Sequence, residues 1–566
     1  MSELKPWLQH YPEEIPATLV YSEEPVQQYL VKAAENFPEK VAIHFMGKEM
    51  TYKKLYEETL IFAGYLQGLG ISKGDRVAIM LPNTPQAVVS YFAILMAGAI
   101  VVQTNPLYTE RELEYQMKDS GAIAIITLDI LYPRVSKVMS QTNLQHIIVT
   151  AIKEYLPFPK NLIYPYIQKK QYGLVVHAKH EGSTHLLKEI IKMKPRELTE
   201  NEFDFAEDLA LLQYTGGTTG FPKGVMLTHK NLVSNASMCQ AWLYKSKPGE
   251  ESVLAILPFF HVYGMTTVLI LSVMQAQKMI ILPKFDVETT LKTIHKQRPT
   301  LFPGAPTIYI GLLNHPDLKK YDLSSIDACI SGSAPLPVEV QQKFEQITGG
   351  RLVEGYGLTE SSPVTHSNFL WDRPRVKGSI GVPYPDTDAA IFSVEGERVP
   401  VGEIGEIVVK GPQVMKGYWN RPEDTAQTLR DGWLLTGDLG YMDDQGYFYV
   451  VDRKKDMIIA GGYNIYPREI EEVLYEHPDV QEVVAAGIPD PYRGETVKAY
   501  IVLKEGSTVT KDELNQFARK YLAAYKVPRI YEFREELPKT AVGKILRRAL
   551  IEEEKKKIEE DNQQQA

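Results

Sequence analysis

The stretch Tyr214–Gly224 (YTGGTTGFPKG) holds the residue types that bind a polyphosphate. Its glycines let the backbone approach phosphate oxygens, its threonine hydroxyls donate hydrogen bonds, and Lys223 supplies a cation. The stretch is not a Walker A motif, because Lys223 is preceded by Pro222 and followed by glycine instead of serine or threonine. Taken alone, it is also compatible with a flexible surface turn.

Four further parts of the chain carry acidic, basic and aromatic residues in short glycine-containing runs. They are Leu257–Gly264 (LPFFHVYG), Gly332–Leu336 (GSAPL) with Glu354–Ser361 (EGYGLTES), Asp431–Pro467 (beginning DGWLLTGDLG and ending VDRKKDMIIAGGYNIYP), and Pro538–Arg548 (PKTAVGKILRR). With the glycine-rich loop, they resemble the adenylate-forming acyl-CoA ligase superfamily, and most closely its bacterial long-chain fatty acyl-CoA synthetases. The resemblance covers nearly the whole chain. It implies that a fatty acid and ATP form acyl-AMP and pyrophosphate, and that the acyl group then passes to CoA.

The resemblance divides nucleotide recognition among several positions. Tyr356 is expected to stack on adenine, Asp438 to accept hydrogen bonds from both ribose hydroxyls, and Arg453 to contact ribose or phosphate. An aspartate after glycine is otherwise a common turn residue, although an ionised acceptor suits a diol. The expected ATP-binding residues are Thr215, Gly216, Gly217, Thr218, Thr219, Gly220, Lys223, Gly332, Ser333, Gly355, Tyr356, Thr359, Asp438, Arg453 and Lys544.

Attack of a carboxylate on the α-phosphate of ATP brings two anions together, and cations must stabilise the charge. The resemblance assigns this task to Lys544, which would bridge the carboxylate and the α-phosphate, and to Mg²⁺ held by Glu360 with Thr215 as the hydroxyl partner. Without the resemblance, Lys544 is a solvated lysine before a basic helix and Glu360 is a helix N-cap partner.

The second half-reaction and the acyl site are expected around two further segments. Gly461 and Gly462 would let the pantetheine chain of CoA pass close to the backbone, and His261 would act as a gate or pocket wall where thiol and acyl carbonyl meet. An isolated histidine in an apolar run is otherwise a core residue. The expected acyl pocket is formed by Phe259, Phe260, Val262 and Met265, although apolar residues in such a run are by default core.

The segment PFFHVYGM contains no carboxylate that could pair with a substrate ammonium group, so the acyl chain is expected to be uncharged. Some long-chain synthetases place a gating tryptophan at the position of Met265, and its absence here leaves chain length open. Two alternatives remain. One is an aryl or medium-chain acyl-CoA ligase of the same superfamily, and the other is a noncatalytic nucleotide-binding adaptor that kept the fold.

Apolar strands alternate with helical patterns along the first part of the chain and predict an α/β fold with layered parallel sheets. Residues 378–411 have short strands between glycine and proline turns, which indicates a small β-barrel-like region. A compact α+β unit follows. The predicted division is an N-terminal domain over 1–451, a hinge over 452–456 with Lys455 at the pivot, and a mobile C-terminal domain over 457–566. Because Lys544 and the glycine-rich loop lie on different domains, catalysis requires domain closure.

Composition indicates the partners and the cellular compartment to expect. The 566 residues have a formal net charge of -9, which gives no global attraction to nucleic acid. Cys239 and Cys329 lie far apart and predict neither a disulfide framework nor a zinc site. The N-terminal residues include acids and prolines and no apolar core, so we do not expect a signal peptide. Residues 253–276 contain no charged residue, but Pro258 and Gly264 interrupt them, which favours a buried core over a membrane span. We expect a cytoplasmic protein and leave a homodimer open.

Residues 153–194 contain eight lysines against three acidic residues. Aromatic side chains are interspersed among them: Tyr155, Phe158, Tyr164, Tyr166 and Tyr172. Basic and aromatic residues together suit the surface of a membrane, where fatty acids partition. A solvated loop explains the same composition. The hypothesis from this segment is peripheral contact with the inner face of the cell membrane.

Overall fold

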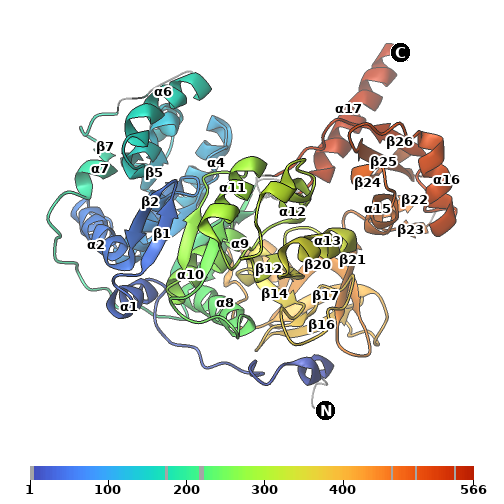
Figure 1. The fold of residues 1–566 in the computed structure, drawn as a ribbon, viewed down its shortest axis with the longest axis horizontal. Coiled ribbons are helices and arrows are strands. Elements are labelled where there is room, and N and C mark those ends of the chain that lie inside the picture. The colour runs from blue at the N-terminus through green and yellow to red at the C-terminus, as the bar shows by residue number, and fades with distance from the viewer. Residues whose placement is uncertain are drawn as a thin grey trace.

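The computed structural model describes residues 5–172, 176, 178–215, 222–460, 463–490, 494–540 and 543–565. Figure 1 shows a large body built from the N-terminal and central parts of the chain and a smaller body formed by the C-terminal part. The expected α/β class, with a large N-terminal and a small C-terminal part, is confirmed.

The largest sheet has eight strands in the order β18-β9-β8-β4-β3-β5-β6-β7. Six of them are parallel: β3 (Arg76–Met80), β4 (Ile100–Gln103), β5 (Ala124–Leu128), β6 (His146–Thr150), β7 (Thr184–Leu186) and β8 (Leu209–Thr215). The strands are apolar on both faces because helices cover them. These helices include α2 (Tyr52–Gly68), α3 (Pro85–Met96), α4 (Glu110–Ser120), α5 (Tyr132–Met139), α6 (Lys160–Tyr172) and α7 (Leu187–Ile190).

The glycine-rich loop joins two antiparallel strands at the edge of this sheet. Strand β8 is followed by β9 (Lys223–Thr228), and β9 pairs in turn with β18 (Gly417–Tyr418). After β9 the chain continues into α8 (His229–Trp242), where the Thr228 side chain caps the helix by accepting from the Asn231 amide. The loop therefore closes a hairpin.

A second layer is built around β10 (Ser252–Ala255) and β11 (Lys278–Ile281), which pair with β1 (Val41–Phe45) and β2 (Lys48–Thr51) in the order β10-β11-β1-β2. A neighbouring sheet contains β12 (Ala328–Ser331), β13 (Arg351–Gly357), β14 (Val364–Ser367) and β15 (Val382–Pro383). Isolated bridges from Val253 to Leu301 and from Leu301 to Ala328 link the two. Helices α1 (Gln28–Asn36), α11 (Val287–Gln297), α12 (Pro306–Leu313) and α13 (Val338–Thr348) also belong to this part of the chain.

The uncharged run 253–276 is core, as predicted. It contains β10, the short helix α9 (Val262–Gly264), a π-helical segment (Met265–Ile270) and α10 (Leu271–Met274), and almost all of its residues are buried. Among the described residues, no helix is both long and apolar enough to cross a bilayer.

The predicted barrel-like region is a five-stranded antiparallel sheet that extends past its expected end. It consists of β16 (Asp388–Phe392), β17 (Gly405–Lys410), β19 (Leu429–Arg430), β20 (Trp433–Met442) and β21 (Phe448–Arg453), with α14 (Pro422–Thr428) preceding β19. Strand β20 pairs with β21 so that Asp438 faces Arg453 in the register. This pairing brings two predicted site residues together.

The C-terminal part has its own sheet and its own buried apolar clusters. Its elements are β22 (Ile458–Ala460), β23 (Tyr463–Ile465), α15 (Pro467–Tyr475), β24 (Val480–Asp490), β25 (Gly494–Leu503), α16 (Lys511–Tyr521), β26 (Ile530–Phe533) and α17 (Arg547–Gln565). Helix α16 begins at Lys511, where Thr510 and Glu513 form a capping box. Lys544 lies in the segment between β26 and α17.

Candidate functional site

The hairpin end of β8 and β9 forms one side of the site. Thr215 and Lys223 are partners in the register, so they flank the intervening loop. The Lys223 ammonium lies 2.8 Å from an Asp424 carboxylate oxygen and 5.0 Å from the centroid of the Tyr418 ring. Five predicted loop residues lie outside the described residues: Gly216, Gly217, Thr218, Thr219 and Gly220.

Glu360 is held next to this hairpin by Tyr418. The Tyr418 hydroxyl donates to Glu360 Oε1 at 2.7 Å, and the Met415 amide donates to the Glu360 carbonyl. Burial and the Glu360 charge raise the pKa of Tyr418, so the phenol keeps its proton for this bond. Sequence reasoning missed Tyr418. Only the pairing of β18 with β9 reveals its place between Lys223 and Glu360.

The oxygen donors at this position fit Mg²⁺ that arrives with ATP. Glu360 offers a carboxylate and Thr215 a hydroxyl, which are ligand types that Mg²⁺ accepts. Within the described part of the chain, no three His, Cys, Asp or Glu side chains are grouped as a metal site. Further ligands would therefore come from phosphate oxygens and water, as is usual for a nucleotide-bound Mg²⁺.

The second side of the site is formed by three side chains from β13, β20 and β21. The Tyr356 hydroxyl donates to Asp438 Oδ2 at 2.6 Å, and Arg453 Nε lies 3.2 Å from Asp438 Oδ1. The Asp438 carboxylate raises the pKa of Arg453, and the Arg453 charge also interacts with Glu360. These contacts place both oxygens of a buried carboxylate beside an aromatic ring and a fixed cation.

The turn after β12 presents backbone to the same space. The Gly332 amide donates to the Gly304 carbonyl, and a Cβ added at Gly332 would lie 2.9 Å from the Tyr263 ring. Ser333 has a φ of 71°, a conformation that side-chain-bearing residues adopt only when the surroundings impose it. Gly355 pairs with Ser367 across β13 and β14.

Lys544 is carried to the site by the C-terminal part of the chain. Its backbone closes a turn with Thr540, whose hydroxyl accepts from the Lys544 amide at 3.1 Å. Burial, and then the neighbouring Arg453 charge, lower the pKa of Lys544 to about 7, while Asp438 opposes the shift. The ammonium group therefore lies within electrostatic reach of Asp438 and Arg453, although more than ninety positions separate it from either.

His261 adjoins this cluster as a neutral imidazole. Burial and the Lys544 charge lower its pKa to about 4. The Tyr263 amide donates to His261 Nδ1 at 3.3 Å, so the proton of the neutral ring resides on Nε2. Such a ring can donate a hydrogen bond from Nε2 but has no free nitrogen there to act as a base.

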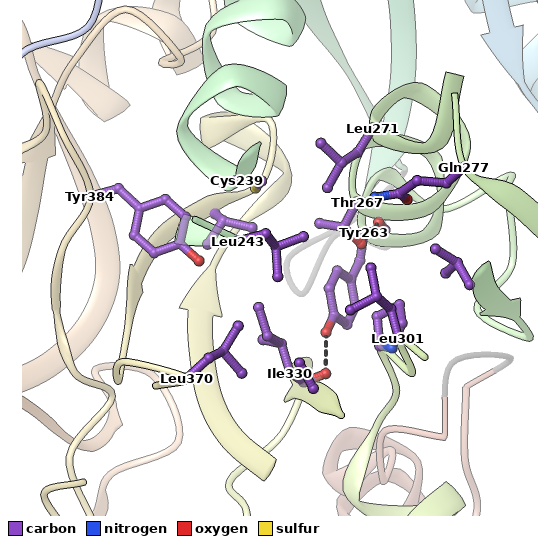
Figure 2. Close-up of a pocket in the computed structure, with 14 residues that line it drawn as sticks. Cys239, Leu243, Tyr263, Thr267, Leu271, Gln277, Leu301, Ile330, Leu370 and Tyr384 are labelled. Carbon is purple, nitrogen blue, oxygen red and sulfur yellow. Dashed lines mark hydrogen bonds between the residues drawn. The ribbon is translucent and has the colours of Figure 1, made fainter. Parts of the chain in front are cut away.

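An apolar cavity of about 40 Å³ lies behind Tyr263 (Figure 2). The Tyr263 hydroxyl donates to the Ile330 carbonyl at 2.7 Å, which holds the ring between the cavity and Gly332. The lining residues are Cys239, Leu243, Val253, Tyr263, Thr267, Leu271, Gln277, Leu301, Pro303, Ala328, Ile330, Val364, Leu370 and Tyr384. The wall is thus almost wholly uncharged and apolar, which suits a hydrocarbon chain.

None of the four residues predicted for the acyl pocket is among those that line this cavity. Phe259, Val262 and Met265 are buried in the core around it, and Phe260 contributes its carbonyl as the acceptor of the Gln213 amide at 2.9 Å. The cavity is lined instead by Tyr263, Thr267 and Leu271 from the same segment. These three residues follow one another at intervals of four, so they share one face of the segment, and the residues predicted for the pocket lie on its other sides.

The segment predicted as hinge, 452–456, is hydrogen-bonded to residues of the C-terminal part. Asp452 accepts from the Arg468 amide at 2.9 Å, and Arg547 reaches Asp456 at 2.8 Å and Glu471 at 2.7 Å. Lys455 lies in a turn, and desolvation, followed by the Arg453 charge, lowers its pKa. Gly461 and Gly462 lie outside the described residues. Arg547, three positions after Lys544, was not singled out from the sequence, because two basic residues at the start of a helix are normally expected to be exposed to solvent.

Comparison with known proteins agrees with this arrangement. Residues 30–419 match the AMP-binding enzyme family and residues 469–544 match the AMP-binding enzyme C-terminal domain. A long-chain-fatty-acid–CoA ligase of Bacillus subtilis (strain 168) is 59% identical over 558 residues, which cover 98% of this chain and 99% of that protein. One from Salmonella typhimurium is 42% identical over 97% of this chain and 98% of its own length.

Among solved structures, the anthranilate CoA ligase AuaEII in complex with anthranoyl-AMP superposes with a TM-score of 0.84. It is 29% identical, and the match covers 96% of this chain and 99% of AuaEII.

Proposed function

This chain belongs to the AMP-binding enzyme family, and we propose that it is a long-chain fatty acid–CoA ligase that forms AMP and pyrophosphate from ATP. The observation that carries the proposal is the meeting of Lys544 from the C-terminal part with Asp438 and Arg453 from β20 and β21. Two cations and a buried carboxylate are thereby gathered in one site, and the apolar cavity behind Tyr263 has no charged residue in its wall.

In the first half-reaction, a carboxylate oxygen of the fatty acid attacks the α-phosphorus of ATP. A new P–O bond forms, the bond from the α-phosphorus to the bridging oxygen breaks, and pyrophosphate leaves. Lys544 would stand between the two anions and offset their repulsion, and Arg453 would add a second positive charge. Asp438 would accept from the ribose hydroxyls, with Tyr356 along the base and the backbone of Gly332, Ser333 and Gly355 beside it.

The phosphates would lie along the β8–β9 hairpin. Thr215, Thr359 and Lys223 would contact phosphate oxygens, and Glu360, oriented by the Tyr418 hydroxyl, would hold the Mg²⁺ that accompanies ATP. When bound, this ion neutralises phosphate charge. The predicted roles of residues 216–220 in the same loop remain part of the proposal.

In the second half-reaction, the CoA thiol attacks the acyl carbonyl carbon, the C–O bond to AMP breaks, and the thiol proton passes to solvent. His261 would serve as a wall that donates from Nε2 to the acyl oxygen, because its nitrogen at that side carries a proton. Rotation about Lys455 would withdraw Lys544 and bring Gly461 and Gly462 to the pantetheine chain. The division into 1–451, 452–456 and 457–566 belongs to this proposal.

The substrate class follows from the cavity. A wall of Leu, Val, Ile and Tyr side chains behind Tyr263 fits an alkyl chain, with Thr267 and Gln277 as its polar exceptions. An aryl-CoA ligase remains the alternative within the family. The experiment is pyrophosphate release across carboxylic acids from acetate to oleate, with 4-coumarate included. Highest kcat/KM for long-chain acids supports the proposal, and preference for the aromatic acid refutes the substrate class.

A noncatalytic adaptor is the alternative from another class. It would bind ATP without releasing pyrophosphate in the presence of any acid in this panel. As to location, we propose a cytoplasmic protein that makes peripheral contact with the inner face of the membrane, because exposed apolar and basic residues meet on α6.

A further inference from the structure

Helix α6 (Lys160–Tyr172) has its apolar side chains on the outside. Leu162, Ile163, Tyr166 and Ile167 are 68%, 50%, 74% and 49% exposed, and Phe158 just before the helix is 79% exposed. A helix on the surface of a protein normally turns such residues inward. The composition of this segment predicted a membrane surface or a solvated loop, and the structure shows a helix in place of the loop.

The inner side of α6 is the polar one. Gln168 is buried and donates to Asp129 Oδ2 at 3.1 Å, while the Lys160 ammonium donates to the Met46 carbonyl at 2.8 Å. Tyr164 packs on the main core. These contacts fix the rotation of the helix, so Leu162 and Tyr166 cannot turn inward without breaking the Gln168 bond.

The exposed residues form one stripe. Leu162 and Tyr166 are four positions apart, as are Ile163 and Ile167, so these four residues share one face of the helix. Lys169 and Lys170 are exposed at the end of that face, and no acidic residue occurs between positions 155 and 180. A contiguous apolar patch bordered by lysines is typical of a face that lies in the surface of an anionic bilayer.

We propose that this face of α6 docks the protein on an anionic lipid bilayer. The apolar side chains enter the headgroup boundary, and Lys169 and Lys170 contact lipid phosphates. Figure 1 shows α6 toward the opposite end of the molecule from α15 and α16. Docking through α6 therefore keeps the C-terminal part, which carries Lys544, away from the membrane-binding face. The inference deepens the proposed membrane location but does not depend on the proposed reaction.

The test is co-sedimentation of the full chain with phosphatidylcholine vesicles, with and without phosphatidylglycerol. The apolar variant combines Leu162→Gln, Ile163→Gln, Tyr166→Gln and Ile167→Gln, and the charge variant combines Lys169→Gln and Lys170→Gln. A matched control carries Val394→Gln, Val401→Gln and Ile404→Gln, which replace apolar residues that are 85%, 54% and 49% exposed elsewhere on the surface.

We expect the wild type and the matched control to bind anionic vesicles equally. The charge variant should bind them about 25-fold more weakly, at about fivefold for each lysine. The apolar variant should lose binding by at least about 100-fold. All variants should keep the wild-type melting temperature and rate of pyrophosphate release with octanoate, because α6 contributes no residue to the site.

Three results would overturn the inference. They are vesicle binding by the α6 variants equal to that of the wild type, no vesicle binding by the wild type, and a wild-type dimer in gel filtration that the apolar variant converts to a monomer without any vesicle binding. The last result would identify the face as an interface between copies. Failure of the ligase proposal would appear only in the pyrophosphate assay, so the two failures are distinguishable.

Discussion

At the scale of single residues, burial and neighbouring charges shift the pKa values of the ionisable side chains in the site. Lys544 has its pKa lowered to about 7, and the pKa of His261 falls to about 4 because burial and the same lysine disfavour its cation. A buried group can be catalytic only in the protonation state that its surroundings permit. Two predictions at this scale concern Lys544.

Replacing Lys544 by alanine should slow pyrophosphate release by about 100-fold or more, because a positioned donor to the transition-state charge is lost. Thioester formation from added acyl-AMP and CoA should stay near the wild-type rate. Lys539→Ala is the matched control, since Lys539 lies in the same segment but pairs with Glu482 at 2.5 Å. Equal losses in both half-reactions would contradict the assigned role.

The kcat/KM of the wild type for ATP in the first half-reaction should fall as pH rises through about 7. The folded-state pKa of Lys544 lies below the usual value for lysine, so the free enzyme loses this cation above about pH 7. A Lys544→Arg variant keeps its charge to high pH and should show a flat profile at a lower rate. A slope that persists in the arginine variant would assign the titration to another group.

At the scale of elements, two local features decide what the side chains can do. The β8–β9–β18 pairing sets Tyr418 between Lys223 and Glu360. The helical segment Val262–Met274 presents Tyr263, Thr267 and Leu271, spaced by four, to the cavity while Met265 packs into the core. The second feature yields a prediction about chain length.

Thr267→Trp should shorten the acyl chain that the enzyme accepts. Thr267 lines the cavity, and an indole there would fill part of the space for the chain. The ratio of kcat/KM for palmitate over octanoate should fall by roughly tenfold or more. Thr266→Val is the control, because Thr266 is fully buried but does not line the cavity. An unchanged ratio in the tryptophan variant would mean that the chain binds elsewhere.

At the scale of the whole molecule, the small C-terminal part must meet the large body for Lys544 to reach the site. Two contacts across this junction are the Arg468–Glu354 ion pair at 3.9 Å and the approach of Gly543 to Thr307 on α12. Gly543 has a φ of 79°, and a Cβ there would fall on the Thr307 hydroxyl. The closeness of this contact makes it a test of domain closure.

Gly543→Ala should hinder the arrangement that carries Lys544 into the site. The strain and the collision cost about 1–3 kcal/mol, which lowers the closed population by roughly 5- to 150-fold. Pyrophosphate release should fall by a factor in this range, while thioester formation from acyl-AMP is spared. Gly506→Ala is the control, because Gly506 has a φ of 82° but nothing lies within 4 Å of the added Cβ. An equal loss in the control would refute closure as the cause.

The sequence by itself determined the α/β class and the core character of residues 253–276, because apolar runs and helix breakers act over a few neighbouring positions. Motif resemblance also pointed to Asp438, Tyr356 and Lys544, which the fold brings into one space. Tertiary structure alone decided the rest. The place of Tyr418 depends on strand pairing, and the outward face of α6 depends on one buried Gln168 bond. The cavity behind Tyr263 depends on residues of β10, β12 and β14 that meet the 263–271 segment. Each of these contacts joins residues far apart in the chain, and a local sequence pattern does not reveal them.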